Sequence, residues 1–230
     1  MKRIVVLTGA GMSAESGIST FRDSGGLWEQ YRIEDVATPE GFRKNPELVL
    51  AFYNQRRKQL FEVTPNEGHK ILAELENDFD IRIITHNIDN LHERAGSTHV
   101  LHLHGELMKA HSTGVGQELF ELTKENQEIH LGDKCPKGFQ LRPHIVWFGE
   151  AVPEIENAIK ICETADVFVI IGTSMQVYPA AGLINYIPKN VPIFVIDPND
   201  VEILNPNIIH LKKGAGEGTK ELKKQLSFLF

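Results

Sequence analysis

The fold is decided by residues 4–14, which read IVVLTGAGMSA. The first part, Ile4 to Leu7, is a short apolar run rich in β-branched residues, and such a run predicts a buried strand. It leads into the pattern Gly-x-Gly-x-x-Ala, in which glycine permits a tight turn and lets backbone N–H groups approach a pyrophosphate. A tight strand-to-helix turn without a ligand explains the same residues, so the segment alone leaves both interpretations open.

Apolar runs and helical patterns alternate along the rest of the chain. Three more apolar runs predict buried strands, at residues 81–85, 167–171 and 192–196. Helical patterns lie between the runs, at residues 46–61, 66–76 and 154–164. This alternation predicts an α/β fold with a largely parallel sheet.

The length of 230 residues allows one large domain or one domain with an insert, at roughly 150 residues per domain. Residues 108–140 differ from the rest because they are polar and contain four glycines, with only a short helical pattern at residues 118–123. We therefore expect a small module that is inserted into the main sheet or lies beside it.

Composition excludes several classes of protein. The chain has 24 basic and 31 acidic residues, and a net charge of −7 argues against a nucleic-acid partner. No apolar stretch approaches the roughly 18 to 20 residues of a membrane-spanning helix, so we expect no membrane partner.

Two cysteines provide no disulfide framework, and the short apolar run at the start is unlike a signal peptide. We expect a cytoplasmic protein, and its oligomeric state cannot be predicted.

Polar and small residues follow the predicted strands, where an open parallel sheet binds its ligands. Asn87 and Asp89 come after the second strand, where they either hold a ligand or cap a turn, and the residues favour neither interpretation. Residues 20–35 resemble a loop and lack the second strand and the ribose-binding acid of a simple dehydrogenase. An arginine in this loop, Arg22, is suited to contact nucleotide phosphates.

Several motifs in the chain resemble those of the sirtuins, the NAD-dependent protein-lysine deacylases. The similar segments occur in the family's order, at residues 9–18 with 21–23, 87–89, 103–106, 142–150 and 172–174. The resemblance implies a Rossmann-like domain, which we assign to residues 1–24, 61–107 and 141–230, and a smaller module of residues 25–60 and 108–140. It also implies that NAD and an acylated protein lysine meet between them, releasing nicotinamide and leaving the acyl group on ADP-ribose.

The resemblance carries over catalytic and NAD-binding residues. It makes His104 the general base, a role that suits imidazole, and selects it over the nearby His102. Asn87 and Asp89 join the catalytic set, and His86 stands where the family usually has glutamine. The expected NAD contacts are Gly9, Ala10, Gly11, Ser13, Ala14, Glu15, Ile18, Phe21, Arg22, Trp28, His86, Asn87, Ile88, Asp89, Gly172, Thr173, Ser174, Asn199 and Ala215.

The resemblance also implies a site for the acylated lysine. Val146, Trp147, Phe148 and Gly149 are expected to pair with the substrate backbone and form the lysine tunnel. Tyr53 and Arg56 lie three residues apart on a predicted helix and share one side of it, although a solvated, charged helix face has the same spacing. Together with Ala37 they resemble the sirtuin class that acts on succinyl- and malonyl-lysine, and a pocket of that width also admits acetyl.

The chain departs from the family at the metal module. Sirtuins place two Cys-x-x-Cys pairs between the His-Gly and Arg-Pro-His segments, whereas here Ser112 replaces the first cysteine and Cys135 is alone in that interval. His111 and His130 with Cys135 match no ordinary zinc spacing, so we predict no bound metal. Two other functions fit the NAD site, transfer of ADP-ribose to protein and a non-catalytic sensor of NAD or ADP-ribose.

Overall fold

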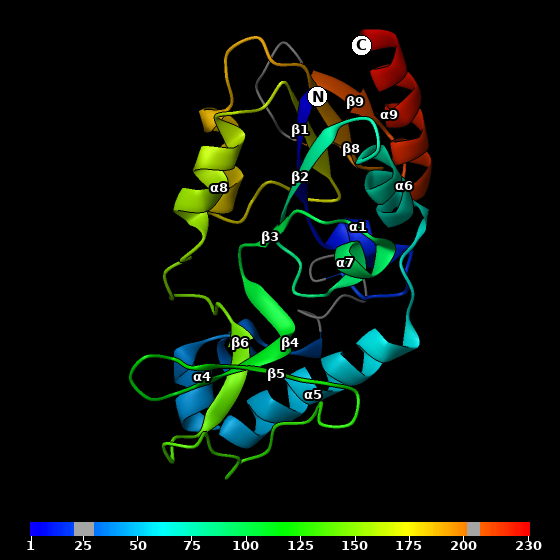
Figure 1. Ribbon diagram of the computed structural model, residues 1–230. Coiled ribbons are helices and arrows are strands. Elements are labelled where there is room, and N and C mark those ends of the chain that lie inside the picture. The colour runs from blue at the N-terminus through cyan, green and yellow to red at the C-terminus, as the bar shows by residue number, and fades with distance from the viewer. Residues whose placement is uncertain (21–29, 202–207) are drawn as a thin grey trace.

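The larger part of the molecule is built on a parallel sheet, seen in the upper half of Figure 1. In this computed structural model, which describes residues 1–20, 30–201 and 208–230, the sheet has six strands in the order β3-β2-β1-β7-β8-β9. The strands are β1 (Arg3–Thr8), β2 (Asp80–Thr85), β3 (Val100–His102), β7 (Val167–Ile171), β8 (Ile193–Ile196) and β9 (Ile208–Leu211). The predicted α/β class and all four predicted strands are confirmed.

Helices cover both faces of this sheet because its strands are apolar on both sides. Ile4 and Val6 face α6 (Glu67–Leu75) and α9 (Ala215–Leu229), which pack against each other. Val5 and Leu7 face the opposite layer, formed by α8 (Ile155–Cys162) and the 3₁₀ helix η1 (Ala180–Tyr186). Asn66 fixes the start of α6, since its side chain accepts hydrogen bonds from two backbone N–H groups of the first turn.

β1 is the strand at which the order of the sheet reverses. Its neighbours are β2 on one side and β7 on the other, and both pair with it in parallel. Backbone bonds continue past the strand ends, from His86 N to Thr8 O (2.9 Å) and from Gly9 N to Ile171 O (3.0 Å). The loops after these three strands therefore lie side by side at the position where open α/β sheets bind ligands.

The smaller part lies below the large sheet in Figure 1. Three antiparallel strands, in the order β5-β4-β6, pack with short helices and one long helix. The elements are α3 (Ile33–Val36), α4 (Pro39–Lys44), α5 (Pro46–Glu62), β4 (Gly105–Ser112), β5 (Leu119–Glu121) and β6 (Leu141–Ile145). Two short helices, α1 (Ala10–Ala14) and α7 (Leu91–Ala95), complete the described elements near the sheet edge.

The predicted helical pattern at residues 118–123 is wrong, because Leu119–Glu121 forms β5 and pairs with β4. The exposure of these residues alternates along the strand, which is the period of an edge strand and not of a helix. β4 begins at Gly105 and β6 spans Leu141–Ile145, so the small sheet includes residues that we assigned to the larger domain. The division into domains remains a proposal.

The residues of the candidate metal module contact separate partners. Ser112 Oγ donates to Cys135 Sγ at 3.3 Å, whereas His111 Nδ1 lies 3.1 Å from His144 Nδ1. His130 faces Glu128 instead. Within residues 1–20, 30–201 and 208–230, no group of three or more His, Cys, Asp or Glu side chains could hold a metal ion. The same part of the chain contains no helix that is long and apolar enough to cross a membrane.

We therefore predict that packing and the Ser112–Cys135 hydrogen bond hold this module together without a metal ion. Metal analysis of the purified protein should find far less than one zinc per chain, and a chelator should leave the melting temperature unchanged. A structural zinc site would behave differently, because its binding energy is folding energy. One zinc per chain, or melting at a lower temperature with the chelator, would contradict the prediction.

Candidate functional site

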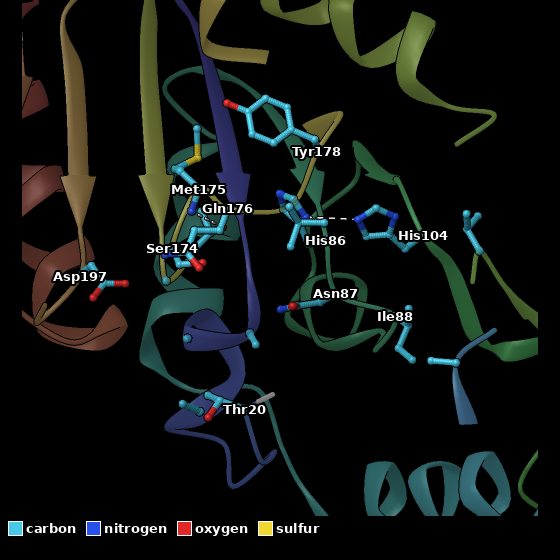
Figure 2. Close-up of a pocket in the computed structure, with 18 of the residues that line it drawn as sticks. Thr20, His86, Asn87, Ile88, His104, Ser174, Met175, Gln176, Tyr178 and Asp197 are labelled. Carbon is cyan, nitrogen blue, oxygen red and sulfur yellow. Dashed lines mark hydrogen bonds between the residues drawn. The ribbon is translucent and has the colours of Figure 1, made fainter. Parts of the chain in front are cut away.

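A cavity of about 740 Å³ lies between the carboxyl edge of the large sheet and the smaller part of the molecule. The turn after β1 and the loops after β2, β7 and β8 line one side of it, and Figure 2 shows several of these residues. α5 and the segment after β6 line the other end. The volume lies in the range of small-molecule and cofactor sites, and both parts of the chain contribute to it.

Most of the predicted site residues meet in this cavity. The predicted residues that line it are Ala10, Gly11, Ala14, Glu15, Ala37, Tyr53, Arg56, His86, Asn87, Ile88, His104, Val146, Trp147, Phe148, Gly149, Gly172, Thr173, Ser174, Asn199 and Ala215. A smaller cavity of about 60 Å³ adjoins it at Asn87 and brings in Ser13, Ile18 and Asp89. Gly9 is the residue that precedes α1 and lies outside both linings. Phe21, Arg22 and Trp28 lie outside the described residues.

Two loops approach each other so closely that glycine is required on both. A Cβ on Gly11 would lie 2.7 Å from Gly172 Cα, and the backbone N–H of Gly11 donates to Gly172 O at 2.9 Å. Gly172 also has a φ of +60°, a conformation that favours glycine. The glycines therefore pack the turn after β1 against the loop after β7, which keeps both backbones at the wall of the cavity.

Asn87 is buried and held by its neighbours at the end of β2. Its Nδ2 donates to Gly9 O at 2.9 Å and to Ser13 Oγ at 3.2 Å, so its amide hydrogens bond to the first turn. Ser13 Oγ in turn donates to Asp89 Oδ2, while Asp89 Oδ1 accepts from the backbone N–H of Leu91. Asp89 thus caps the turn that follows it, which is one of the two roles that the sequence allowed. Asn87 links the loops after β1 and β2.

His104 and His86 face each other in the lining of the cavity. The atoms His104 Nε2 and His86 Nδ1 lie 3.2 Å apart, as the dashed line in Figure 2 shows. Burial lowers the pKa of His104 to about 4. The ring is therefore neutral at pH 7, and a neutral imidazole has one nitrogen lone pair that can accept a proton.

Aromatic residues close the other end of the cavity. Trp147 Nε1 donates to the Tyr53 hydroxyl at 3.0 Å, and both side chains are buried. Indole N–H is only a donor, so the Tyr53 oxygen accepts this bond and its own hydrogen is available to another partner. Burial raises the pKa of Tyr53 above its ordinary value, which keeps the phenol protonated.

The guanidinium group of Arg56 lies beside Tyr53 with neutral partners. Its Nη2 donates to Gln59 Oε1 at 2.8 Å, and its Cζ lies 5.7 Å from the centre of the Phe52 ring. No carboxylate of the described residues lies within ion-pair distance of it. Burial lowers the pKa of Arg56, which is the expected effect of partly removing a cation from water.

Arg142 and Glu150 fix Trp147 and were not predicted as site residues. Arg142 Nη1 lies 2.8 Å from Glu150 Oε1, and the Arg142 guanidinium lies 3.3 Å from the centre of the Trp147 ring. Glu150 Oε2 also accepts from the Trp147 backbone N–H at 2.7 Å. Both residues belong to the 142–150 segment, but only the fold reveals that they hold the indole ring against Tyr53.

Other lining residues were also missed by sequence reasoning. They follow the strand ends or adjoin predicted positions, and they include Thr20, Phe52, Met175, Gln176, Tyr178 and Asp197. Figure 2 shows five of them, all except Phe52, around the sheet edge. An open parallel sheet binds ligands beyond the carboxyl ends of its strands. Continuing the predicted site a few residues beyond Ser174 and Ile196 would therefore have found four of them, Met175, Gln176, Tyr178 and Asp197.

Buried neutral histidines predict a loss of stability in acid. Folded His104 has a pKa of about 4, below the ordinary value of about 6.5. Between these values the unfolded chain binds a proton that the folded chain does not, so the free energy of unfolding falls as pH falls through this window. The upper limit is about 1.4 kcal/mol per pH unit for each such group.

His104→Asn should therefore reduce the slope of unfolding free energy against pH between pH 6.5 and 4.5. Urea unfolding at several pH values measures this slope, and the same change at the exposed His99 is the matched control. Equal slopes in the parent protein and His104→Asn would mean that His104 does not resist protonation.

Comparisons with known proteins agree with this geometry. A family model described as "Sir2 family" matches residues 9–179. An "NAD-dependent protein deacylase" of Bacteroides thetaiotaomicron is 60% identical over 98% of this chain and 98% of its own length, and one of Helicobacter pylori is 50% identical over 91% and 92%. A solved structure of a Sir2 homologue in complex with NAD superimposes with a TM-score of 0.88 at 41% identity, covering 99% of this chain and 90% of that one.

Proposed function

We propose that this chain, which belongs to the Sir2 family, removes succinyl and malonyl groups from protein lysines and consumes NAD in doing so. Its family and its relatives make it an NAD-dependent protein deacylase. The choice of an acidic acyl group is the finer part of the proposal. It is carried by one observation, the charged Arg56 at the end of the cavity with only neutral partners among the described residues.

The residues along the cavity fit NAD. The glycine turn after β1 places its own backbone at the cavity wall. The loops after β7 and β8 continue the lining, and so does Ala215 at the start of α9. NAD, when bound, supplies a ribose carbon that becomes electrophilic as nicotinamide leaves. Asn87 uses both amide hydrogens within the protein, so its Oδ1 is the atom left to accept from a ribose hydroxyl or from the nicotinamide amide. His104 is suited to accept the proton of a ribose hydroxyl.

The acylated lysine would enter from the side of the smaller part. Val146 N donates to His104 O and Phe148 N donates to Ala37 O, so the segment after β6 runs past the base toward the acyl end. Trp147 and Ala37 line that end, where the short alanine side chain leaves space for a longer acyl group.

The acyl end supplies two complementary donors for a carboxylate. Trp147 leaves the Tyr53 hydrogen free to donate, and Arg56 brings a positive charge that is partly removed from water. A carboxylate here would accept from both, and charge-assisted hydrogen bonds of this kind are stronger than neutral ones. An acetyl group also fits the space but leaves Arg56 without an anion, so the site favours succinyl and malonyl.

Replacing Arg56 tests the acyl preference directly. Arg56→Met should lower kcat/KM for a succinyl-lysine peptide by about a hundredfold, because the acyl carboxylate loses its charged partner. kcat/KM for the matching acetyl peptide should change by less than about threefold, since acetyl makes no such contact. Peptide mass spectrometry measures both rates. Lys58→Met on the exposed side of the same helix is the control, and an equal loss on both peptides would make Arg56 structural.

Replacing His104 tests the enzymatic function itself. His104→Tyr should abolish acyl removal, because phenol is a far weaker base than imidazole at pH 7. The circular dichroism spectrum should stay that of the parent protein. Nicotinamide release and peptide mass are followed with acetyl, malonyl and succinyl peptides. Activity near that of the parent would exclude His104 as the base, and no acyl loss from any peptide by the parent protein would favour a non-catalytic NAD sensor.

A further inference from the structure

His102 has a largely buried side chain, and the proposed reaction leaves it without a role. It ends β3, two residues before His104, and its side chain is 7% exposed. Both ring nitrogens have partners. Nδ1 lies 2.9 Å from the backbone O of Asn87, and Nε2 lies 2.7 Å from Glu93 Oε1 on α7. The ring thus bridges a surface carboxylate and the loop that carries Asn87.

Counting hydrogens assigns the charge of this ring. A backbone carbonyl only accepts, and so does a carboxylate, so each nitrogen of His102 must carry a hydrogen. A neutral imidazole has one N–H, whereas imidazolium has two. The geometry therefore makes His102 a cation that pairs with the Glu93 anion.

The surroundings support this assignment. Burial disfavours the charge on His102, but the hydrogen bond and charge of Glu93 outweigh it and raise the pKa of the ring above its ordinary value. Burial likewise disfavours charged Glu93, yet His102 holds the pKa of that carboxyl below its usual range. Each partner thus favours the charged form of the other.

His102 completes the support of Asn87. The backbone N–H of Asn87 donates to Thr85 Oγ1 at 3.0 Å, and Thr85 Oγ1 accepts from Thr8 Oγ1 at 2.8 Å, so hydroxyls of the sheet hold one side of this residue. The carbonyl side is held by the charged ring of His102. The hydroxyl contacts do not titrate near neutral pH, whereas the contact with His102 depends on a proton.

We propose that His102 is a positioning residue whose protonated ring, paired with Glu93, holds the backbone carbonyl of Asn87. Loss of this proton at high pH then loosens the loop after β2, which carries Asn87. The inference rests on the proposed function, in which Asn87 contacts NAD. A neutral ring can keep only one of its two donated bonds, so deprotonation must release either Glu93 or Asn87.

Other ionisable groups face His102 from the elements packed around it. α7 contributes Glu93 and His92, and burial holds the pKa of His92 well below its usual value, so that ring is neutral. Among the residues that the structure describes, Asp89 in the loop and Glu106 on β4 are the other acidic side chains that interact with the ring. Glu106 is paired with Lys109, which leaves Glu93 as the direct partner of the ring.

The experiment compares pH profiles of kcat/KM for NAD, from pH 6 to 10, in the parent protein, Glu93→Gln and His102→Gln. Glutamine at 93 keeps an acceptor oxygen but removes the charge that favours imidazolium. The alkaline decline should therefore begin about one pH unit lower, with activity near that of the parent at pH 6.5 and about tenfold lower at pH 9. His102→Gln can still donate to Asn87 O but does not titrate, so the decline assigned to His102 should disappear.

Glu76→Gln is the matched control. It neutralises a carboxylate that binds Thr98, close to the start of β3, and should leave the profile unchanged. NMR of the His102 ring provides a second readout, in which Glu93→Gln should lower the pKa of the ring. A merely structural role would lower activity equally at all pH values.

Superimposable profiles in the parent protein and Glu93→Gln, or a His102 ring that is neutral at pH 6, would overturn the inference. A parent protein without turnover of any acyl peptide would instead refute the proposed function. In that case the Kd of NAD, measured over the same pH range in all four proteins, still tests whether charged His102 fixes the position of Asn87.

Discussion

The site depends on the contact between the turn after β1 and the loop after β7. Gly11 and Gly172 are so close that neither position accepts a side chain, and a backbone hydrogen bond joins them. The loop after β2 is tied to the same point, because His86 N donates to Thr8 O and Asn87 Nδ2 donates to Gly9 O. Three strand ends thus share one rigid junction, and the residues proposed to bind NAD project from it.

Burial and pairing give opposite charge states to two histidines that are two residues apart. His104 lies beside His86, and burial lowers its pKa to about 4 with no carboxylate of the described residues to offset that effect. His102 is also buried, but Glu93 and a backbone carbonyl keep it charged. The first arrangement leaves a neutral ring with a lone pair, and the second suits a fixed support.

Sequence reasoning identified four of the described strands, β1, β2, β7 and β8, together with the glycine turn, because their signals are local. Short runs rich in β-branched residues mark β1, β2 and β7, and the small or polar residues that follow mark the cavity wall. It missed β5, since three residues at an edge carry too little periodicity to distinguish a strand from a helix. It placed Tyr53 and Arg56 on one helix side but could not predict the hydrogen bond from Trp147 to Tyr53, which joins residues 94 positions apart.

The most direct test of the account is a comparison of kcat/KM for succinyl-, malonyl- and acetyl-lysine in one peptide sequence at saturating NAD. Because Tyr53 and Arg56 offer two donors to a carboxylate, we expect both acidic acyl groups to be removed with a higher kcat/KM than acetyl. An equal or higher value for acetyl would contradict the account. It would mean that the positive charge at the end of the cavity serves the fold and not the substrate.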